Sequence, residues 1–190
     1  MRVIAGSHRG RRLCGPKGTR LRPTSDKVRE ALFSILGARV PGSRFLDLYA
    51  GTGAVGIEAL SRGADLVTFV ELDPKAVQLM RKNLTTCRLL NQADVRVTST
   101  NVFLQRIDWW QGPYDLLFAD PPYTDTEQLE ILHAAWQPGL LTNQALVIIE
   151  QDARTEPPDS IHHAKLIRRY AYGDTALFIY GRSNTESVAL

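Results

Sequence analysis

The sequence has 190 residues, of which 44% are hydrophobic, 23% are charged and 8% are aromatic. These values are those of one folded globular domain, and they exclude a disordered tail, a collagen-like rod and a coiled coil. Aliphatic runs such as residues 145–149 are far shorter than the ~20 residues of a membrane helix, and the basic N-terminus argues against a secretory signal. We therefore expect a cytoplasmic protein without a membrane partner.

The cysteines and histidines predict no metal centre. Cys14 and Cys87 stand far apart, without a Cys-x-x-Cys pair or a histidine at ligand spacing. We expect both thiols to be reduced. The adjacent His162 and His163 are expected to be exposed to solvent, because neighbouring side chains of an extended segment point in different directions.

Positive charge is concentrated at the start of the chain. Residues 1–29 hold nine Lys or Arg against one acid, a charge of +8, so the remainder carries −5 for a net charge of +3. A basic segment on an acidic body is typical of proteins that bind nucleic acid, because it gathers a polyanion at one place. A solvated tail punctuated by glycines is the alternative interpretation.

Residues 1–40 are expected to form a small basic extension. Residues 2–6 and 11–15 predict a hairpin with arginines on its exposed face. A helix follows, with Thr24 as the expected N-cap and apolar residues at helical spacing until Gly37. This helix is expected to pack on the body of the protein through its apolar stripe.

Strands and helices alternate through residues 41–182. The expected elements are, in chain order, a strand at 45–49, a helix at 54–62, a strand at 66–71, a helix from residue 74, strands at 94–98 and 114–119, a helix at 126–136 and a strand at 145–150. This order predicts an α/β fold with a mostly parallel, doubly wound sheet. Residues 164–172 and 175–181 predict an antiparallel C-terminal hairpin, and residues 183–190 are expected to fray.

A glycine-rich loop follows the first of these strands. Residues 51–56 match G-x-G-x-x-G, and Glu71 stands 20 residues beyond Gly51 at the end of the second strand. This pattern fits the dinucleotide fingerprint, so NAD is one candidate ligand and a merely structural turn is another. S-adenosylmethionine presents the same adenosine, and Asp47 could meet its cationic amino group. The position of Asp47, four residues before Gly51, favours S-adenosylmethionine.

Other cofactor contacts are expected where neighbouring strands end, because ligands of such sheets bind beyond the carboxyl ends of the strands. Glu71 is the candidate for the ribose hydroxyls, Asp73 is the N-cap of the next helix, and Asn101 could bind an adenine edge. The candidate cofactor-binding residues are Asp47, Ala50, Gly51, Thr52, Gly53, Glu71, Leu72, Asn101, Val102 and Asp120.

The tetrapeptide Asp120-Pro121-Pro122-Tyr123 follows the fourth strand and indicates the reaction. Two prolines stiffen the backbone and remove two donors, so a carbonyl beside the Asp120 carboxylate can face a cleft. This pair of acceptors matches the two donors of a planar amino group, and Tyr123 offers a face on which a base can stack. The alternative is a proline-stiffened loop with an exposed tyrosine.

These segments resemble a known family. Residues 45–53, FLDLYAGTG, resemble motif I of Rossmann-like S-adenosylmethionine methyltransferases, and residues 120–123 resemble the motif of those that methylate planar amino nitrogens. Residues 9–13, 21–33 and 172–175 are similar to the bacterial small-subunit ribosomal RNA guanine-N2 methyltransferase family. The resemblance extends from Arg2 to about Tyr180.

The resemblance implies methyl transfer from S-adenosylmethionine to N2 of a guanine in 16S ribosomal RNA by a monomer, with the RNA free or in an assembling small subunit. Asp120 and the Pro121 carbonyl would hold the amine, Tyr123 would stack on the extruded base, and either Asp120 or water would take the proton. The expected RNA-binding residues are Arg9, Arg11, Arg12, Arg20, Arg22, Thr24 and Arg29; the expected catalytic residues are Asp120, Pro121, Pro122 and Tyr123.

Several rivals remain. An adenine-N6 methyltransferase acting on DNA or RNA uses the same tetrapeptide, usually with Asn where this chain has Asp120. A release-factor glutamine methyltransferase needs a larger N-terminal domain, and a nicotinamide oxidoreductase needs a second substrate region. From another class, a non-catalytic RNA-binding or ribosome-assembly protein would have no need of both Asp120 and Gly51, and this chain has both.

Overall fold

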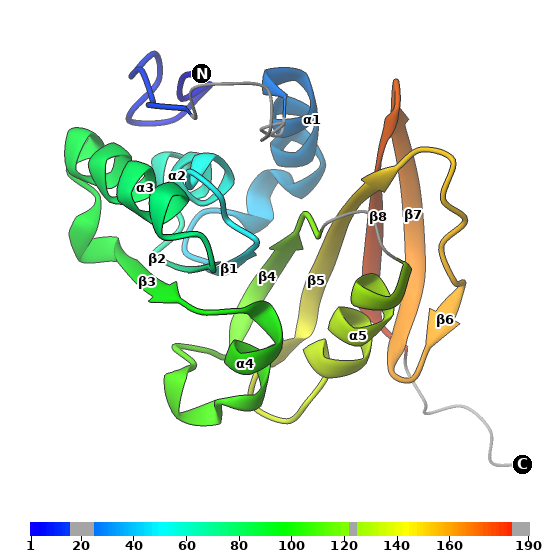
Figure 1. The fold of residues 1–190 in the computed structure, drawn as a ribbon. Helices are drawn as coiled ribbons and strands as arrows, with labels where there is room; N and C mark the ends of the chain where they lie inside the picture. Colours follow the sequence, from blue (N-terminus) through cyan, green and yellow to red (C-terminus); the bar gives the residue numbers. More distant parts are fainter. Residues whose placement is uncertain (16–24, 122–124, 184–190) are drawn as a thin grey trace, which may run out of the picture.

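The computed structural model describes residues 1–15, 25–121 and 125–183 (Figure 1). Its helices are α1 (Asp26–Leu36), α2 (Ala54–Ser61), α3 (Pro74–Cys87), α4 (Thr100–Gln105) and α5 (Asp125–Ala135), with 3₁₀ turns η1 (Gly37–Arg39), η2 (Leu90–Gln92) and η3 (Ile107–Trp109). Its strands are β1 (Arg44–Leu48), β2 (Leu66–Glu71), β3 (Ala93–Val97), β4 (Tyr114–Ala119), β5 (Leu141–Asp152), β6 (Ser160–Ile161), β7 (Ala164–Tyr172) and β8 (Thr175–Arg182). Within these described ranges, no helix has the length and apolar character needed to cross a membrane.

The eight strands form one sheet in the order β3-β2-β1-β4-β5-β8-β7-β6. Strands β3, β2, β1, β4 and β5 pair in parallel, whereas β8 is antiparallel to β5 and β7 is antiparallel to β8. The predicted α/β fold with an antiparallel C-terminal hairpin is therefore confirmed. The strand order reverses between β1 and β4, and a ligand of such a sheet binds beside this reversal, at the carboxyl ends of the strands.

Helices cover both faces of the sheet (Figure 1). Alternate residues of β4 show the two cores: Leu116 and Phe118 belong to the cluster that includes side chains of α1, α2 and α3, whereas Leu117 and Ala119 belong to the cluster with α4 and α5. The central strands are thus buried on both faces, which explains their nearly continuous apolar sequences.

The N-terminal extension shares the core of the body. An isolated antiparallel bridge joins Arg2 and Arg12, and hydrogen bonds from Val3 N to Arg11 O (2.9 Å) and from Gly10 N to Val3 O (2.9 Å) close the turn between them. Residues 1–15, which we call the arm, therefore make a hairpin with one bridge in place of full strands. The buried residues of α1 pack in the same cluster as strands β1 and β4.

Helix α1 begins one residue later than expected. Ser25 is its N-cap, because Ser25 Oγ accepts a hydrogen bond from Val28 N (3.2 Å), whereas the expected cap, Thr24, lies outside the described residues. Gly37 ends the helix as predicted: it adopts φ +49° and its N–H is bonded to Phe33 O.

Most other predicted bounds agree with the structure to within one residue, but three elements differ more. Residues 100–105 form helix α4, where no helix or strand was predicted. Six residues are too few to show a helical period, and the helix begins after the Ser99 cap, whose side chain accepts from Val102 N (3.3 Å). Strand β5 begins at Leu141 instead of 145, beside a register shift against β4. The two-residue strand β6 carries no sequence signal of its own.

The cysteines and the paired histidines are as expected. Cys14 and Cys87 are free thiols, and His162 and His163 are exposed. The ring of His162 lies 4.1 Å, centroid to centroid, from that of His133 on α5. Among the residues with described positions, no three His, Cys, Asp or Glu side chains gather in a way that could hold a metal ion.

Candidate active site

The glycine loop between β1 and α2 leaves its backbone accessible. Gly51 adopts φ +55° and Gly53 φ +78°, the left-handed region that glycine tolerates best. A Cβ at Gly53 would lie 2.7 Å from Met80 Cγ, so that glycine is also required by packing. A Cβ at Gly51 would meet nothing within 4 Å. The open side of Gly51 allows a ligand to approach the main chain.

Tyr49 is a strained residue at the start of this loop that the sequence analysis did not single out. It adopts φ +56°, which costs a non-glycine residue about 1–2 kcal/mol. The next residue, Ala50, donates its N–H to Val70 O of β2 (3.0 Å) and so returns the chain to the sheet. Such strain concentrates at ligand-binding loops, and here it accompanies the reversal of strand order.

Asp47 lies beneath the glycine loop as a buried carboxyl group. Only 1% of it is exposed, and its Oδ2 accepts a hydrogen bond from Gly56 N (2.9 Å). Burial raises the pKa of Asp47 to about 8, and the negative charges of Glu71 and Asp120 add to the rise, whereas the bond from Gly56 opposes it. Three carboxyl groups therefore meet at this edge of the sheet, where a cationic ligand would be stabilised.

The Asp47→Asn variant is expected to be more stable than the parent protein at high pH. The folded state holds a proton on Asp47 up to about pH 8, whereas the unfolded chain releases it near the ordinary value of 3.8. Folding therefore carries a penalty that grows as pH rises between these two values, and Asn, which cannot ionise, does not have it. The difference in melting temperature should be small near pH 4 and reach its maximum by about pH 8. A difference that does not change with pH would contradict the assignment of this proton.

Glu71 connects the glycine loop to the turn after β2. Its Oε2 accepts from Gly51 N (2.7 Å) and its Oε1 accepts from Asp73 N (2.7 Å). Each oxygen keeps a free lone pair, so the carboxylate can still accept hydrogen bonds from two ribose hydroxyls. Asp73 has the capping role predicted for it, because its side chain accepts from Lys75 N (2.9 Å) at the start of α3.

Two exposed apolar side chains flank this region. Leu72, directly after β2, is 65% exposed, and Val102, near the start of α4, is 43% exposed. Exposed aliphatic residues after adjacent strands suit the two faces of a flat base. The Asn101 side chain, expected to bind an adenine edge, donates instead to Glu130 Oε2 on α5 (3.1 Å), so a contact to adenine requires this hydrogen bond to open.

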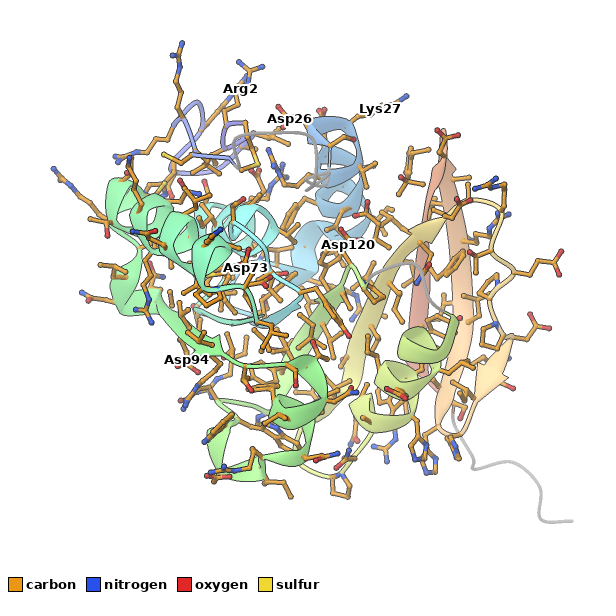
Figure 2. The ribbon with its side chains drawn as sticks, in the orientation of Figure 1. Arg2, Asp26, Lys27, Asp73, Asp94 and Asp120 are labelled. Carbon is orange, nitrogen blue, oxygen red and sulfur yellow. The ribbon has the colours of Figure 1, made fainter. Side chains whose placement is uncertain are left out.

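Asp120 and Pro121 follow β4, which lies beside β1 in the sheet. Asp120 is half-buried and Pro121 is buried, and the Asp120 charge acts on Asp47. Figure 2 shows Asp120 at the end of β4; Asp73 likewise follows the carboxyl end of its strand, β2. The structure thus brings Asp120 to the edge that holds the glycine loop and Glu71. Pro122 and Tyr123 lie outside the described residues.

The residues expected to bind RNA divide into three groups. Arg9 and Arg12 are exposed, and Arg11 is exposed while donating from Nη1 to Thr86 O near the end of α3 (2.7 Å). The second group, Arg20, Arg22 and Thr24, lies outside the described residues. Arg29 forms the third and is fully buried.

The prediction that Arg29 contacts RNA is therefore wrong. Its Nη2 donates to Arg2 O (2.6 Å) and to Asp26 Oδ1 (3.0 Å), and its Nε lies 3.9 Å from Glu58 Oε2. Burial lowers the pKa of Arg29, while the charges of Asp26 and Glu58 oppose this shift. Arg29 holds the arm against α1 and α2.

Glu58 and Asn83 are two buried polar residues that the sequence analysis missed. Glu58 accepts from the main-chain N–H groups of Ile4 (2.7 Å) and Ala5 (2.9 Å) and thereby docks the arm on α2. Asn83 of α3 is bonded to both the arm and the glycine loop. The available signals were a lone acid in the apolar run 54–60 and an amide next to Leu84 of the apolar stripe of α3.

Comparisons with known proteins agree with this arrangement. The family model described as "Conserved hypothetical protein 95" matches residues 1–181. The Bacillus subtilis protein named "Putative rRNA methyltransferase YlbH" is 37% identical over 180 residues, which are 95% of this chain and 98% of the relative. The Escherichia coli protein named "Ribosomal RNA small subunit methyltransferase D" is 34% identical over 177 residues, 90% of this chain and 87% of the relative.

A solved structure shares the whole fold. The "Putative methyltransferase yhhF" of Escherichia coli is 35% identical and superposes with a TM-score of 0.84, covering 96% of this chain and 98% of that one. The chain therefore belongs to the conserved hypothetical protein 95 family, the family of the small-subunit ribosomal RNA methyltransferases D.

Proposed function

We propose that this protein transfers a methyl group from S-adenosylmethionine to the exocyclic N2 amine of a guanine in 16S ribosomal RNA. One observation carries the proposal: the accessible glycine loop and the Asp120-Pro121 pair lie at the carboxyl ends of β1 and β4, the neighbouring strands where the sheet order reverses. The names of the relatives support ribosomal RNA as the substrate. We further propose that the protein acts as a monomer in the cytoplasm.

The described residues fit S-adenosylmethionine. Glu71 would accept hydrogen bonds from the ribose hydroxyls, and Leu72 and Val102 would cover the adenine. The open side of Gly51 would admit the methylene group that joins the ribose to the sulfur. Asp47, which lies beneath the loop, would lose its proton and balance the positive charge of the methionine group. When bound, the cofactor supplies a methyl group activated by the adjacent sulfonium.

Asp120 has the chemistry needed to position the amine. Its carboxylate and the Pro121 carbonyl would accept the two N–H groups and thereby orient the nitrogen lone pair toward the methyl carbon. As the new nitrogen–carbon bond forms and the carbon–sulfur bond of the donor breaks, positive charge would pass from sulfur to nitrogen, where the Asp120 carboxylate would stabilise it. The amine proton would then pass to Asp120 or to water, leaving a neutral methylamino group on the base and S-adenosylhomocysteine as the other product. Tyr123 would stack on the extruded base.

The proposal is tested by incubating the purified protein with labelled S-adenosylmethionine and two substrates, naked 16S RNA and assembling small subunits from cells that lack the protein. We expect label in one modified nucleoside, N2-methylguanosine, at one site, and comparison of the substrates shows which one the enzyme uses. N6-methyladenosine as the product would identify an adenine methyltransferase. An absence of label with both substrates, from protein that binds the cofactor, would reject the proposal.

The exposed arginines of the arm are expected to bind RNA phosphates. Changing Arg9 and Arg12 to Ala should weaken RNA binding and flatten the plot of log affinity against log salt by just under one unit per lost contact. Arg106→Ala is the matched control, because this arginine is exposed, is paired with Asp108 and directly follows α4, a helix that lies far from the arm (Figure 1). If the variant with Arg9 and Arg12 changed to Ala keeps the RNA affinity and salt slope of the parent, as the control should, the arm does not hold RNA.

A further inference from the structure

Asn83 is a buried side chain with bonds to two functional segments at once. It lies on α3 and is 1% exposed. Its Oδ1 accepts from Cys14 N (2.7 Å), and its Nδ2 donates to Cys14 O (3.0 Å) and to Thr52 O (3.0 Å). Both amide hydrogens and the amide oxygen are therefore engaged, so neither segment can shift without leaving a buried polar atom unpaired or moving the amide.

The two segments have different functions. Cys14 is near the end of the described arm, which carries the exposed Arg9 and Arg12. Thr52, which is buried, is the central residue of the glycine loop between Gly51 and Gly53. Asn83 thus joins the segment expected to bind RNA to the loop expected to bind the cofactor, across residues far apart in the sequence.

The other polar anchors of the arm lie away from this loop. Glu58 accepts from Ile4 N and Ala5 N, while Ser61 Oγ donates to Ala5 O (2.6 Å) and accepts from His8 N (3.0 Å). Both residues lie in the second half of α2, one to two turns beyond its start at Ala54. Among the hydrogen bonds of the described arm, only those to Asn83 continue into the glycine loop.

We propose that Asn83 is a positioning residue that couples RNA binding on the arm to cofactor binding at the glycine loop. The proposal rests on the function proposed above. RNA bound to the arm favours the docked position of the arm. In that position the Cys14 backbone holds the Asn83 amide, and the amide in turn holds the Thr52 carbonyl in the conformation that the cofactor binds. By linkage, the cofactor then tightens RNA binding by the same factor as RNA tightens cofactor binding.

The coupling is measured by titrating S-adenosylmethionine into the protein with and without saturating 16S ribosomal RNA. The parent protein should bind the cofactor at least ~5-fold more tightly with RNA, the lower end of usual coupling energies. Asn83→Asp keeps the acceptor for Cys14 N and loses both donors, and Asn83→Ala removes the whole amide. In both variants we expect the ratio of the two affinities to fall toward one.

Ser61→Ala is the matched control. It removes two hydrogen bonds that dock the arm on α2 but none that reach the glycine loop. Its RNA affinity should fall, yet its coupling ratio should stay at least as large as the parent's, because the link through Asn83 is intact. Hydrogen exchange at residues 51–53 gives a second readout: RNA should slow it in the parent and in Ser61→Ala, but not in the Asn83 variants.

The outcomes separate the two proposals. Equal cofactor affinity with and without RNA in a parent protein that methylates RNA would overturn the coupling and leave the proposed function intact. An unchanged coupling ratio in a folded Asn83 variant would do the same. If the parent binds neither cofactor nor RNA, the proposed function fails together with the coupling. If one Asn83 variant does not fold, the other decides the result. If neither folds, Cys14→Pro replaces them, because it lacks the N–H group that donates to Asn83 Oδ1. Loss of the RNA-induced protection at residues 51–53 in that variant would support the coupling, and unchanged protection would overturn it.

Discussion

Replacing Asp120 by Ala is expected to lower the single-turnover rate of methyl transfer by ~10² to 10³, the effect of removing one preorganised electrostatic partner. The fold should survive, because Asp120 is only half-buried and follows the end of β4. Saturating cofactor keeps any change in cofactor affinity out of the measured rate. Asp120→Asn keeps an acceptor oxygen but loses the charge, so it should retain part of the activity. The measurement is the rate at saturating cofactor with enzyme in excess of RNA.

Asp73→Ala is the control for this experiment. Asp73 is another carboxylate at the same edge, but its side chain caps α3. Its removal should reduce stability by about 1 kcal/mol, as for a lost N-cap, and leave the rate per folded molecule close to the parent's. Full activity in Asp120→Ala would reject the site, since the residue would then only terminate a strand.

Replacing Glu58 by Ala is expected to reduce the free energy of unfolding by about 3–5 kcal/mol, the usual result of removing one partner of a buried ion pair. The loss leaves the fully buried guanidinium of Arg29 without this carboxylate and the N–H groups of Ile4 and Ala5 without their acceptor. Arg29→Ala should show a loss of similar size. Denaturant unfolding of each variant measures the effect.

Arg62→Ala tests whether the loss of stability depends on the burial of the arginine that pairs with Glu58. Arg62 also pairs with Glu58, through Nε at 2.8 Å, but its side chain is 21% exposed. A partly solvated pair contributes less, so this variant should lose only about 1 kcal/mol. A loss below about 1 kcal/mol in Glu58→Ala would show that the arm is not held on α2 by this carboxylate.

Local signals were sufficient for much of the fold. Strands β2 and β4 have the predicted bounds, because each is a short apolar run between polar or turn residues. Helix α3 begins at Pro74 after Asp73 because capping needs only neighbouring residues. The short helix α4 was missed since its six residues carry no period and its cap at Ser99 resembles an ordinary loop serine.

The residues of the candidate site were likewise predicted in part. The glycine loop, Glu71 and Asp120 could be placed together from the sequence, because parallel strands bring their carboxyl ends to one edge. The sequence also placed Arg29 among the cations expected to bind RNA, with Arg9 and Arg12. Charge counting treats these residues alike, although Arg9 and Arg12 are exposed and Arg29 is buried.

The α/β order, the glycine loop after β1 and the acid after β4 could be read from short stretches of sequence, because each depends on residues close together along the chain. Which polar groups face solvent and which are buried depends on contacts that form only when the chain folds. Arg29 meets Glu58, and Asn83 meets both Cys14 and Thr52, across large separations in sequence. The free energy of a buried charge or amide depends on partners that the chain supplies only after it has folded.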